Sequence, residues 1–251
     1  MNQTLKLALA ALILSLGMLL SAQMLSKLFV RVRQEQAISV KGYAERDVVS
    51  DIGAFACTVS ARGASLKEAY EELQRSRQVV TAYLERSGFK PGELELGTID
   101  TTKVMRRNAE GKETNEIEYH DAAQRIEVTS TNVALLRSVA TAITELIKDG
   151  VDIRASPPSF LISDLKDIKL DLLAAATQDA NRRALAIAAN SGGRIGALIS
   201  AQQGVFQITR RNSTDISGYG EYDTSTIEKT AKVVVTLQYA IEPGSPPAER
   251  R

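Results

Sequence analysis

Strand-forming segments come mostly in pairs along this chain, between three helical segments, and this order restricts the fold class more than any other feature. The strand patterns cover residues 37–62 (two strands), 93–106, 116–130, a short strand through Val151 and Ile153, 195–210 and 229–242. Apolar residues recur at helical spacing in residues 65–87, 132–148 and 164–190. Because the strands outnumber the helices and occur in pairs, the sequence predicts an α+β fold of mostly antiparallel sheet rather than a doubly wound parallel sheet.

The order of these elements, ββα–ββ–αβ–αββ, predicts two interleaved modules of sheet packed with helices, preceded by one N-terminal hydrophobic helix. The outer module combines residues 34–90 with residues 164–242, and an inserted ββαβ lobe covers residues 91–163. Residues 243–251 are rich in proline and polar residues, so we expect a disordered tail. A chain of 251 residues is long enough to bury a large core without disulfides or metals.

Short-range signals place several of these elements. Ser65 and Glu68 form the capping-box pattern, in which each side chain accepts a hydrogen bond from a backbone N–H at the helix start. Gly88 is typical of a helix end. Residues 52–61 are apolar on both faces and predict a central strand. The alanine-rich residues 174–189 predict a helix that another element approaches closely.

The N-terminal region contains a long apolar segment, residues 7–25, with no charged side chain and with basic residues on both sides. An uncleaved membrane helix needs about 20 apolar residues, which the segment nearly provides. A cleaved signal peptide needs small residues at the cut, and Leu20 fits that requirement poorly. We therefore predict that residues 1–33 form a signal anchor or transmembrane segment and that residues 34–251 lie outside the cytoplasm. A cleaved signal peptide is the alternative.

The chain is poor in side chains that carry chemistry. Cys57 is the only cysteine and His120 the only histidine, so an intramolecular disulfide, a CxxC pair and a two-histidine metal site are all excluded. Cys57 lies in an apolar strand pattern and is interpreted as a buried hydrophobe rather than as the partner of His120 in a catalytic dyad. With 31 basic and 30 acidic residues, nothing favours a nucleic-acid partner. We predict no catalytic residues, no metal site and no cofactor.

Two local patterns resemble ligand sites and are better explained by secondary structure. The Gly-rich residues 191–196 follow a predicted helix, whereas a phosphate-binding loop precedes one, so we interpret them as a helix end and turn. Asp164, Asp167 and Asp171 recur at helical spacing, but two lysines lie among them. Acidic residues near a helix start also favour the helix dipole. We therefore predict no cation site there.

Three motifs follow one another along the chain. The first is the opening strand, Ile38-Ser39-Val40-Lys41-Gly42-Tyr43-Ala44-Glu45. The second is a spaced alanine pattern in the long helix, Ala176, Asp179-Ala180, Arg183-Ala184 and Ala188. The third is the helix exit, Gly193-Arg194-Ile195-Gly196. In this order and spacing, over about residues 36–242, they resemble the SIMPL domain family of bacterial envelope proteins. Ala44 replaces the family's usual second glycine, and Val49-Ser50-Asp51 keeps only the aspartate of its Pro-Asp pair.

The resemblance implies a two-module α+β fold, an envelope location and, in some members, large ring or barrel assemblies. It carries no established catalytic residues, and the family's link to oxidative stress is phenotypic. We therefore expect a non-catalytic, membrane-anchored envelope protein that self-assembles as a homo-oligomer and has a structural or stress-protective role. The expected location is the bacterial inner membrane, single-pass, with the main domain in the periplasm. A cleaved form would be soluble in the periplasm.

Two other functions stay open on the sequence. The chain could be a periplasmic module that binds a ligand or protein through the loops 105–118 and 211–227. The second loop contains Tyr219 and Tyr222, which are either partner contacts or ordinary loop aromatics. The chain could also be an enzyme that uses carboxylates, a lysine or a tyrosine outside any recognised motif. The sequence names no small-molecule ligand for either alternative.

Overall fold

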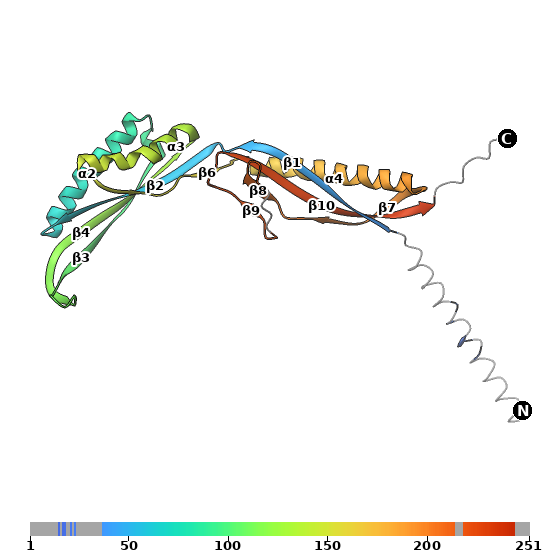
Figure 1. The fold of residues 1–251 in the computed structure, drawn as a ribbon, viewed down its shortest axis with the longest axis horizontal. Helices are drawn as coiled ribbons and strands as arrows, with labels where there is room; N and C mark the ends of the chain where they lie inside the picture. Colours follow the sequence, from blue (N-terminus) through green and yellow to red (C-terminus); the bar gives the residue numbers. More distant parts are fainter. Residues whose placement is uncertain are drawn as a thin grey trace, which may run out of the picture. The chain divides into compact units, whose positions relative to one another are not determined.

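The computed structural model describes residues 37–213 and 218–243, together with the isolated residues 15, 17, 18, 21 and 23. Apart from those isolated residues, the expected anchor, residues 1–33, lies outside the described part, and so does the tail after Pro243. Within the part of the chain that is described, no helix combines the length and hydropathy of a membrane span. The described residues form the predicted α+β fold, with two mostly antiparallel sheets (Figure 1).

One sheet is built around β10, which pairs with β1, β8 and β7. Residues Lys229–Lys232 of β10 pair with β8, and the stretch from Val235 to Pro243 pairs with β7, so one long strand serves two partners in succession. The short β9 adds to β8 in parallel orientation. The strands of this sheet are β1 (Ala37–Val49), β7 (Gly193–Gln203), β8 (Gln207–Arg210), β9 (Glu221–Tyr222) and β10 (Glu228–Pro243).

The other sheet is built around β2, which pairs with β4 along one edge and with β5 and β6 in succession along the other. β4 also pairs with β3 to form a long hairpin. The predicted central position of residues 52–61 and the predicted hairpin are both confirmed. The strands are β2 (Ile52–Gly63), β3 (Leu94–Arg107), β4 (Glu113–Ser130), β5 (Asp152–Ala155) and β6 (Ser159–Leu161).

The described chain divides into two compact units that alternate along the sequence. We call residues 37–44, 170–205 and 233–243 the terminal unit, and the described residues of 45–169 and 206–232 the central unit. These boundaries differ from those of the expected modules. β2 belongs to residues 34–90 and β4 to residues 91–163, yet the two strands pair from Gly53 to Gly63. Both strands lie in the central unit.

In the central unit, two helices pack against the β2–β4 sheet: α2 (Leu66–Arg86) and α3 (Val133–Ala142) (Figure 1). Between α2 and β3 the chain makes a short 3-10 turn, Pro91–Glu93. The buried core combines strand residues with one face of each helix; its largest fully buried apolar side chains are Phe160, Leu73, Leu84, Ile126, Leu136, Ile143, Val59, Val80 and Val128. Burying a side chain of this size contributes about 1.5 to 3 kcal/mol, so this core is the main stabilising feature of the unit.

The start of α2 follows its sequence signal with one change of partner. The Ser65 hydroxyl accepts a hydrogen bond from the Glu68 N–H at 3.2 Å, as the capping box predicts. The Glu68 carboxylate accepts from the Ala64 N–H at 3.1 Å instead of from the Ser65 N–H. At the other end, Gly88 has a φ of +110°, a conformation that disfavours residues with a Cβ. Both boundaries of the predicted helix are therefore confirmed.

Three predicted elements differ in detail. The strand predicted over residues 195–210 is two strands, because the Gly204 N–H donates to the Val234 carbonyl at 2.8 Å and the chain leaves the ladder there. The helix predicted over residues 132–148 is α-helical to Ala142 and continues as the 3-10 helix Ile143–Asp149. The loop predicted over residues 211–227 contains β9, which pairs with β8.

In the terminal unit, the long helix α4 (Leu165–Asn190) contributes a narrow buried stripe that recurs every four residues: Leu172, Ala176, Ala180, Ala184 and Ala188. The strands contribute alternate buried residues, among them Ile38 and Val40 on β1 and Val235 and Leu237 on β10. Because four of the five stripe residues are alanine, the helix backbone can lie close to the sheet. The close approach predicted from the alanine-rich sequence is thus confirmed.

Candidate functional site

The lone cysteine and the lone histidine lie far apart on the central sheet. Cys57 is 1% exposed, and burial raises the pKa of its thiol to about 11, so the thiol is protonated at neutral pH. Cys57 pairs with Ile126 across the ladder, whereas His120 pairs with Gly63. Six residues along a strand span about 20 Å. This separation rules out a catalytic dyad, and Cys57 is the buried hydrophobe that its sequence context predicts.

The two patterns that resemble ligand sites fit local structure. The α4 helix ends at Asn190, and the Ser191 hydroxyl donates to the Ile187 and Ala188 carbonyls before β7 begins at Gly193. Residues 191–196 are therefore a helix end and turn, as predicted. Among the described residues, no group of three His, Cys, Asp or Glu side chains is placed to hold a metal ion, and this holds for Asp164, Asp167 and Asp171.

The motif glycine of the opening strand lies against the motif alanines of α4. A Cβ placed on Gly42 would lie 2.0 Å from the Ala176 carbonyl oxygen and 2.6 Å from the Ala180 backbone nitrogen. Real Cβ atoms essentially never approach so closely, and both obstacles are backbone atoms that cannot rotate away. The first two motifs therefore meet at one contact between β1 and α4, which admits no side chain at position 42.

The aspartate of the helix motif ties α4 to the same strand. The Asp179 carboxylate accepts a hydrogen bond from the Tyr43 backbone N–H at 3.0 Å and another from the Arg183 guanidinium at 2.8 Å. The Tyr43 hydrogen bond is the main reason that the pKa of Asp179 lies below its ordinary value of 3.8. Gly42, Asp179 and Arg183 thus all contribute to the packing of β1 against α4.

A buried lysine ammonium joins three segments of the central unit. Lys229 is 0% exposed, and its Nζ donates to the Ser50 hydroxyl at 2.6 Å, to the Phe160 carbonyl at 2.8 Å and to the Thr226 carbonyl. Burial lowers the pKa of Lys229, and the nearby carboxylate of Asp223 offsets part of that effect. An ammonium has three N–H donors and all three are used here, so the arrangement suits a structural cation.

Asp51, next to Ser50, makes a second link at the same place. Its carboxylate accepts from the Ser163 N–H at 2.8 Å and from the Ser163 hydroxyl. The hydrogen bond from the Ser163 hydroxyl is the largest cause that lowers the pKa of Asp51. Asp51 therefore connects the β1–β2 turn to the segment that precedes α4 within the central unit.

Lys229 was missed by sequence reasoning, although the sequence contains its signal. Residues 229, 231, 233, 235, 237 and 239 share one face of a period-2 pattern, and all of them are buried. A lysine in phase with five inward-facing residues indicates a buried ammonium. The acceptors around it could not be named, because they come from residues 50, 160 and 226.

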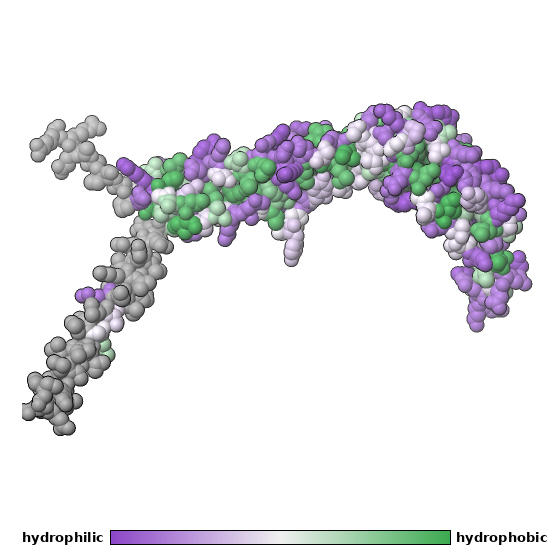
Figure 2. Space-filling model, turned by 180° about the vertical axis from the view of Figure 1, so that it is seen from behind, coloured by the Kyte–Doolittle hydropathy of each residue, from purple (hydrophilic) through white to green (hydrophobic). Residues whose placement is uncertain are grey.

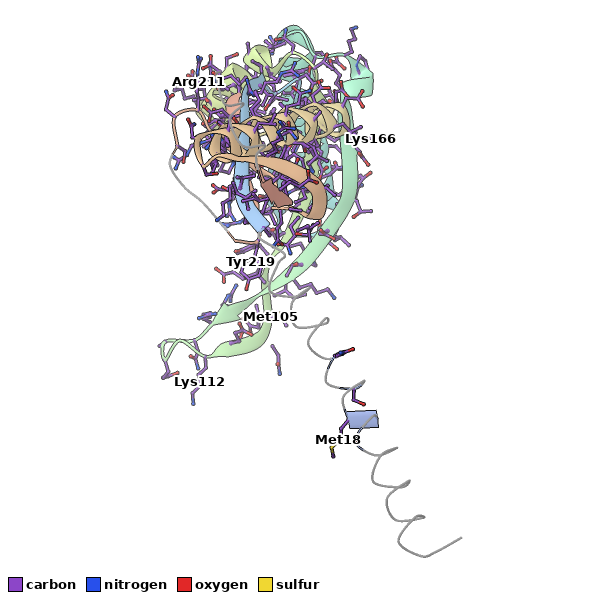
Figure 3. The ribbon with its side chains drawn as sticks, turned by 90° about the vertical axis from the view of Figure 1, so that its right-hand side faces the viewer. Met18, Met105, Lys112, Lys166, Arg211 and Tyr219 are labelled. Carbon is purple, nitrogen blue, oxygen red and sulfur yellow. The ribbon has the colours of Figure 1, made fainter. Side chains whose placement is uncertain are left out.

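The tyrosines and the hairpin tip of the central unit have different environments. Tyr222 accepts a hydrogen bond from the Ile162 N–H through its hydroxyl at 3.1 Å, so it is part of the packed structure. Tyr219 is fully exposed (Figure 3). Figure 3 also shows Met105 and Lys112 on the projecting end of the β3–β4 hairpin. Arg106–Glu116 and Arg107–Glu113 ion pairs cross this exposed end.

The terminal unit has open sheet edges and exposed apolar side chains. Among the strands that the structure describes, β1 and β7 each pair with β10 alone. Leu198 and Ile199 on β7 are 51% and 46% exposed, and Leu185 and Ile187 on α4 are each 49% exposed. Figure 2 shows hydrophobic residues at the surface of this unit on the face opposite to that of Figure 1. Ile187 lines a shallow pocket with Ser39, Val40 and Lys41 of β1, so the exposed residues of α4 do not all lie beside β7.

The comparison with known families agrees with the positions of the three motifs. A family model named SIMPL, described as a protein of unknown function (DUF541), matches residues 38–239. This chain belongs to the SIMPL family. No curated protein matches the chain. The SIMPL match begins at Ile38 on β1 and ends at Tyr239 on β10, so it covers both units and includes the contact between β1 and α4.

Proposed function

We propose that this SIMPL protein is a non-catalytic, membrane-anchored envelope protein that self-assembles through its α+β domain and has a structural or stress-protective role. Family membership supports the domain type. Four residues that could carry chemistry are instead buried or held in structural hydrogen bonds: Cys57, Asp51, Asp179 and Lys229. This is consistent with a role without catalysis. The uncharged residues 7–25 support the anchor. The proposed location is the bacterial inner membrane, with the main domain in the periplasm, and the alternative is a cleaved form that is soluble in the periplasm.

The observation that carries the self-assembly proposal is the open edge of β7 together with the exposed Leu198 and Ile199 on that strand. An unpaired strand edge presents backbone N–H and C=O groups that can pair with another strand. Contiguous apolar residues on a soluble surface mark interaction sites. A second copy that pairs along β7 would cover Leu198 and Ile199, which are about half exposed in the single chain. The resulting homo-oligomer would bury both features at once.

The test is the absolute mass of the full chain, purified from the membrane fraction in mild detergent and measured by light scattering on a sizing column. We expect a discrete oligomer for the wild type. The double variant Leu198→Lys, Ile199→Lys is expected to shift the mass toward the monomer, because two lysines at the interface would have to be desolvated without partners. Val79→Lys is the matched control, since Val79 is an exposed apolar residue (39%) on α2 of the central unit.

A wild-type monomer would overturn the self-assembly proposal. So would an oligomer whose mass is the same in the double variant and in the Val79→Lys control. The same sizing run on residues 34–251, after circular dichroism has shown that this fragment is folded, tells whether the N-terminal segment is needed for assembly. Assembly of the fragment would place the interface in the α+β domain.

The second candidate function is a periplasmic binding module that uses the loops 105–118 and 211–227. The observation in its favour is the exposed end of the β3–β4 hairpin, together with the fully exposed Tyr219. Under this alternative, replacing the hairpin end 105–118 by a two-residue turn abolishes partner capture and leaves the mass of the assembly unchanged. Cross-linking in cells, compared between the wild type and the shortened variant, measures the capture. If the shortened variant keeps every cross-linked partner, the loop has no binding role.

A further inference from the structure

The central unit contains a pocket of about 580 Å³ beside the buried lysine. Its lining comes from α3, from the end of β8, from β6 and from the segment that leads into β10. A volume of this size is in the range of pockets that hold small organic molecules. The lining residues all belong to the central unit, and the proposed self-assembly uses none of them.

Positive charge is concentrated in the lining. Three arginines contribute to it: Arg137 from α3, Arg210 at the end of β8 and Arg211 directly after it. Glu228 is the carboxylate among the lining residues. Asp47 also pairs with Arg211, and the Asp223 carboxylate accepts hydrogen bonds from the lining residues Ser225 and Thr226. With Lys229 included, four cationic groups stand against three carboxylates, which leaves one positive charge. All of these residues are in the described part of the chain. An arrangement of this kind favours a dianion over a neutral ligand.

The guanidinium of Arg211 is held in place at the surface (Figure 3). One of its nitrogens, Nη1, lies 3.4 Å from the Glu228 carboxylate, and the other, Nη2, lies 3.3 Å from the carboxylate of Asp47. These ion pairs orient the side chain and neutralise part of its charge. Glu228 therefore acts against an anionic ligand in two ways: it repels the anion directly and it competes for Arg211.

The buried ammonium adds to the positive field from behind the pocket wall. Lys229 Nζ donates to the backbone carbonyls of Phe160 and Thr226, and both of these residues line the pocket. Lys229 directly follows the lining residue Glu228 in the sequence, and its side chain is shielded from water. Phe160 and Ile227 also make part of the lining apolar. The pocket therefore combines fixed positive charge with an apolar wall.

We propose that this pocket binds a small organic phosphate, a phosphomonoester whose dianionic end contacts the arginines and whose organic part lies toward Phe160 and Ile227. Guanidinium groups donate parallel N–H bonds that match the oxygens of phosphate. Three arginines from two separate elements can surround such a group from more than one side. The same phosphomonoester group is present in a free metabolite and in the headgroup of phosphatidic acid, and the experiment separates these two sources.

The experiment is isothermal titration calorimetry of the full chain in phosphatidylcholine nanodiscs, with phenyl phosphate and inorganic phosphate as probes. We expect phenyl phosphate to bind with a dissociation constant of about 1 mM or tighter and inorganic phosphate to bind more weakly, since it lacks the apolar part. Arg137→Gln should weaken phenyl phosphate binding by about tenfold or more, as for loss of a charged hydrogen bond. Glu228→Gln should strengthen it, because the repulsion is removed and Arg211 is released.

Arg75→Gln is the matched control. Arg75 lies on α2, pairs with Glu72 and does not line the pocket, so the same charge change there should leave binding unaltered. Thermal melts of each variant show whether it remains folded; Arg137 is exposed, so its replacement leaves the core intact. Absence of phenyl phosphate binding to the folded wild type would overturn the proposal. Equal weakening by Arg137→Gln and Arg75→Gln would also overturn it, since binding would then follow net charge alone.

The lipid source is tested with nanodiscs that contain phosphatidic acid, whose headgroup is a phosphomonoester. If the site holds a headgroup, phenyl phosphate binding is lost in these nanodiscs and kept in phosphatidylcholine. If the site takes a free phosphomonoester, binding in the two kinds of nanodisc is the same at physiological ionic strength. Either result supports the phosphate site and assigns its ligand source.

Discussion

Gly42→Ala is expected to lower the free energy of unfolding by about 3 kcal/mol or more, because overpacking at a rigid contact cannot be relieved by side-chain rotation. The added Cβ would lie 2.0 Å from the Ala176 carbonyl oxygen and 2.7 Å from the Ala180 Cβ. To admit it, the backbone of β1 must move away from α4. That movement would also break the hydrogen bond from the Tyr43 N–H to Asp179.

Urea unfolding followed by circular dichroism measures the loss, and hydrogen exchange shows where it arises. We expect faster exchange in α4 and β1, with the β2–β4 sheet less affected. Gly92→Ala is the control, since no atom lies within 4 Å of the position that its Cβ would occupy. A glycine-to-alanine change at an open position is neutral or slightly stabilising. If the two variants were equally stable, the close contact between β1 and α4 would be wrong.

Lys229→Met is expected to destabilise the protein by about 2 to 4 kcal/mol at neutral pH, although methionine has a similar length. The variant removes the donors to the Ser50 hydroxyl and to the Phe160 and Thr226 carbonyls, and these acceptors stay buried. Relief from burying a charge offsets part of this loss. Lys232→Met is the control, because Lys232 lies on the same strand, is only partly buried and donates to the Ser213 carbonyl at 2.9 Å. Its effect should be clearly smaller.

The pH dependence gives Lys229 a second, independent readout. Its pKa in the folded protein is lowered by burial from the ordinary value of 10.5, which applies to the unfolded chain. Between these two values the unfolded state binds more protons, so the stability of the wild type should rise with pH up to about 10.5 relative to Lys229→Met. Taking the difference between the two proteins cancels the contribution of Cys57. A difference that stays constant over this range would contradict the burial of a charged Lys229.

Local sequence patterns predicted where most helices and strands begin and end, because a few neighbouring residues determine these boundaries. The Ser65 hydroxyl meets an N–H three residues away, Gly88 supplies the positive φ that ends α2, and the apolar pattern of residues 52–61 follows from burial on both faces. The alanine spacing of α4 likewise predicted a close approach, and Gly42 in the opening motif fits it. The α+β class and the structural interpretation of Cys57 and of residues 191–196 could therefore be reached from the sequence alone.

Tertiary structure decided what depends on residues distant in the chain. β2 pairs with β4 across the boundary between the expected modules, and both strands lie in the central unit. The acceptors of Lys229 come from residues 50, 160 and 226, and the arginines of the pocket come from residues 137, 210 and 211. Sequence periodicity shows which face of an element is buried. Periodicity does not show which other element covers that face. Long-range packing determines this, because the hydrogen bonds and close contacts between distant segments form only when the chain folds.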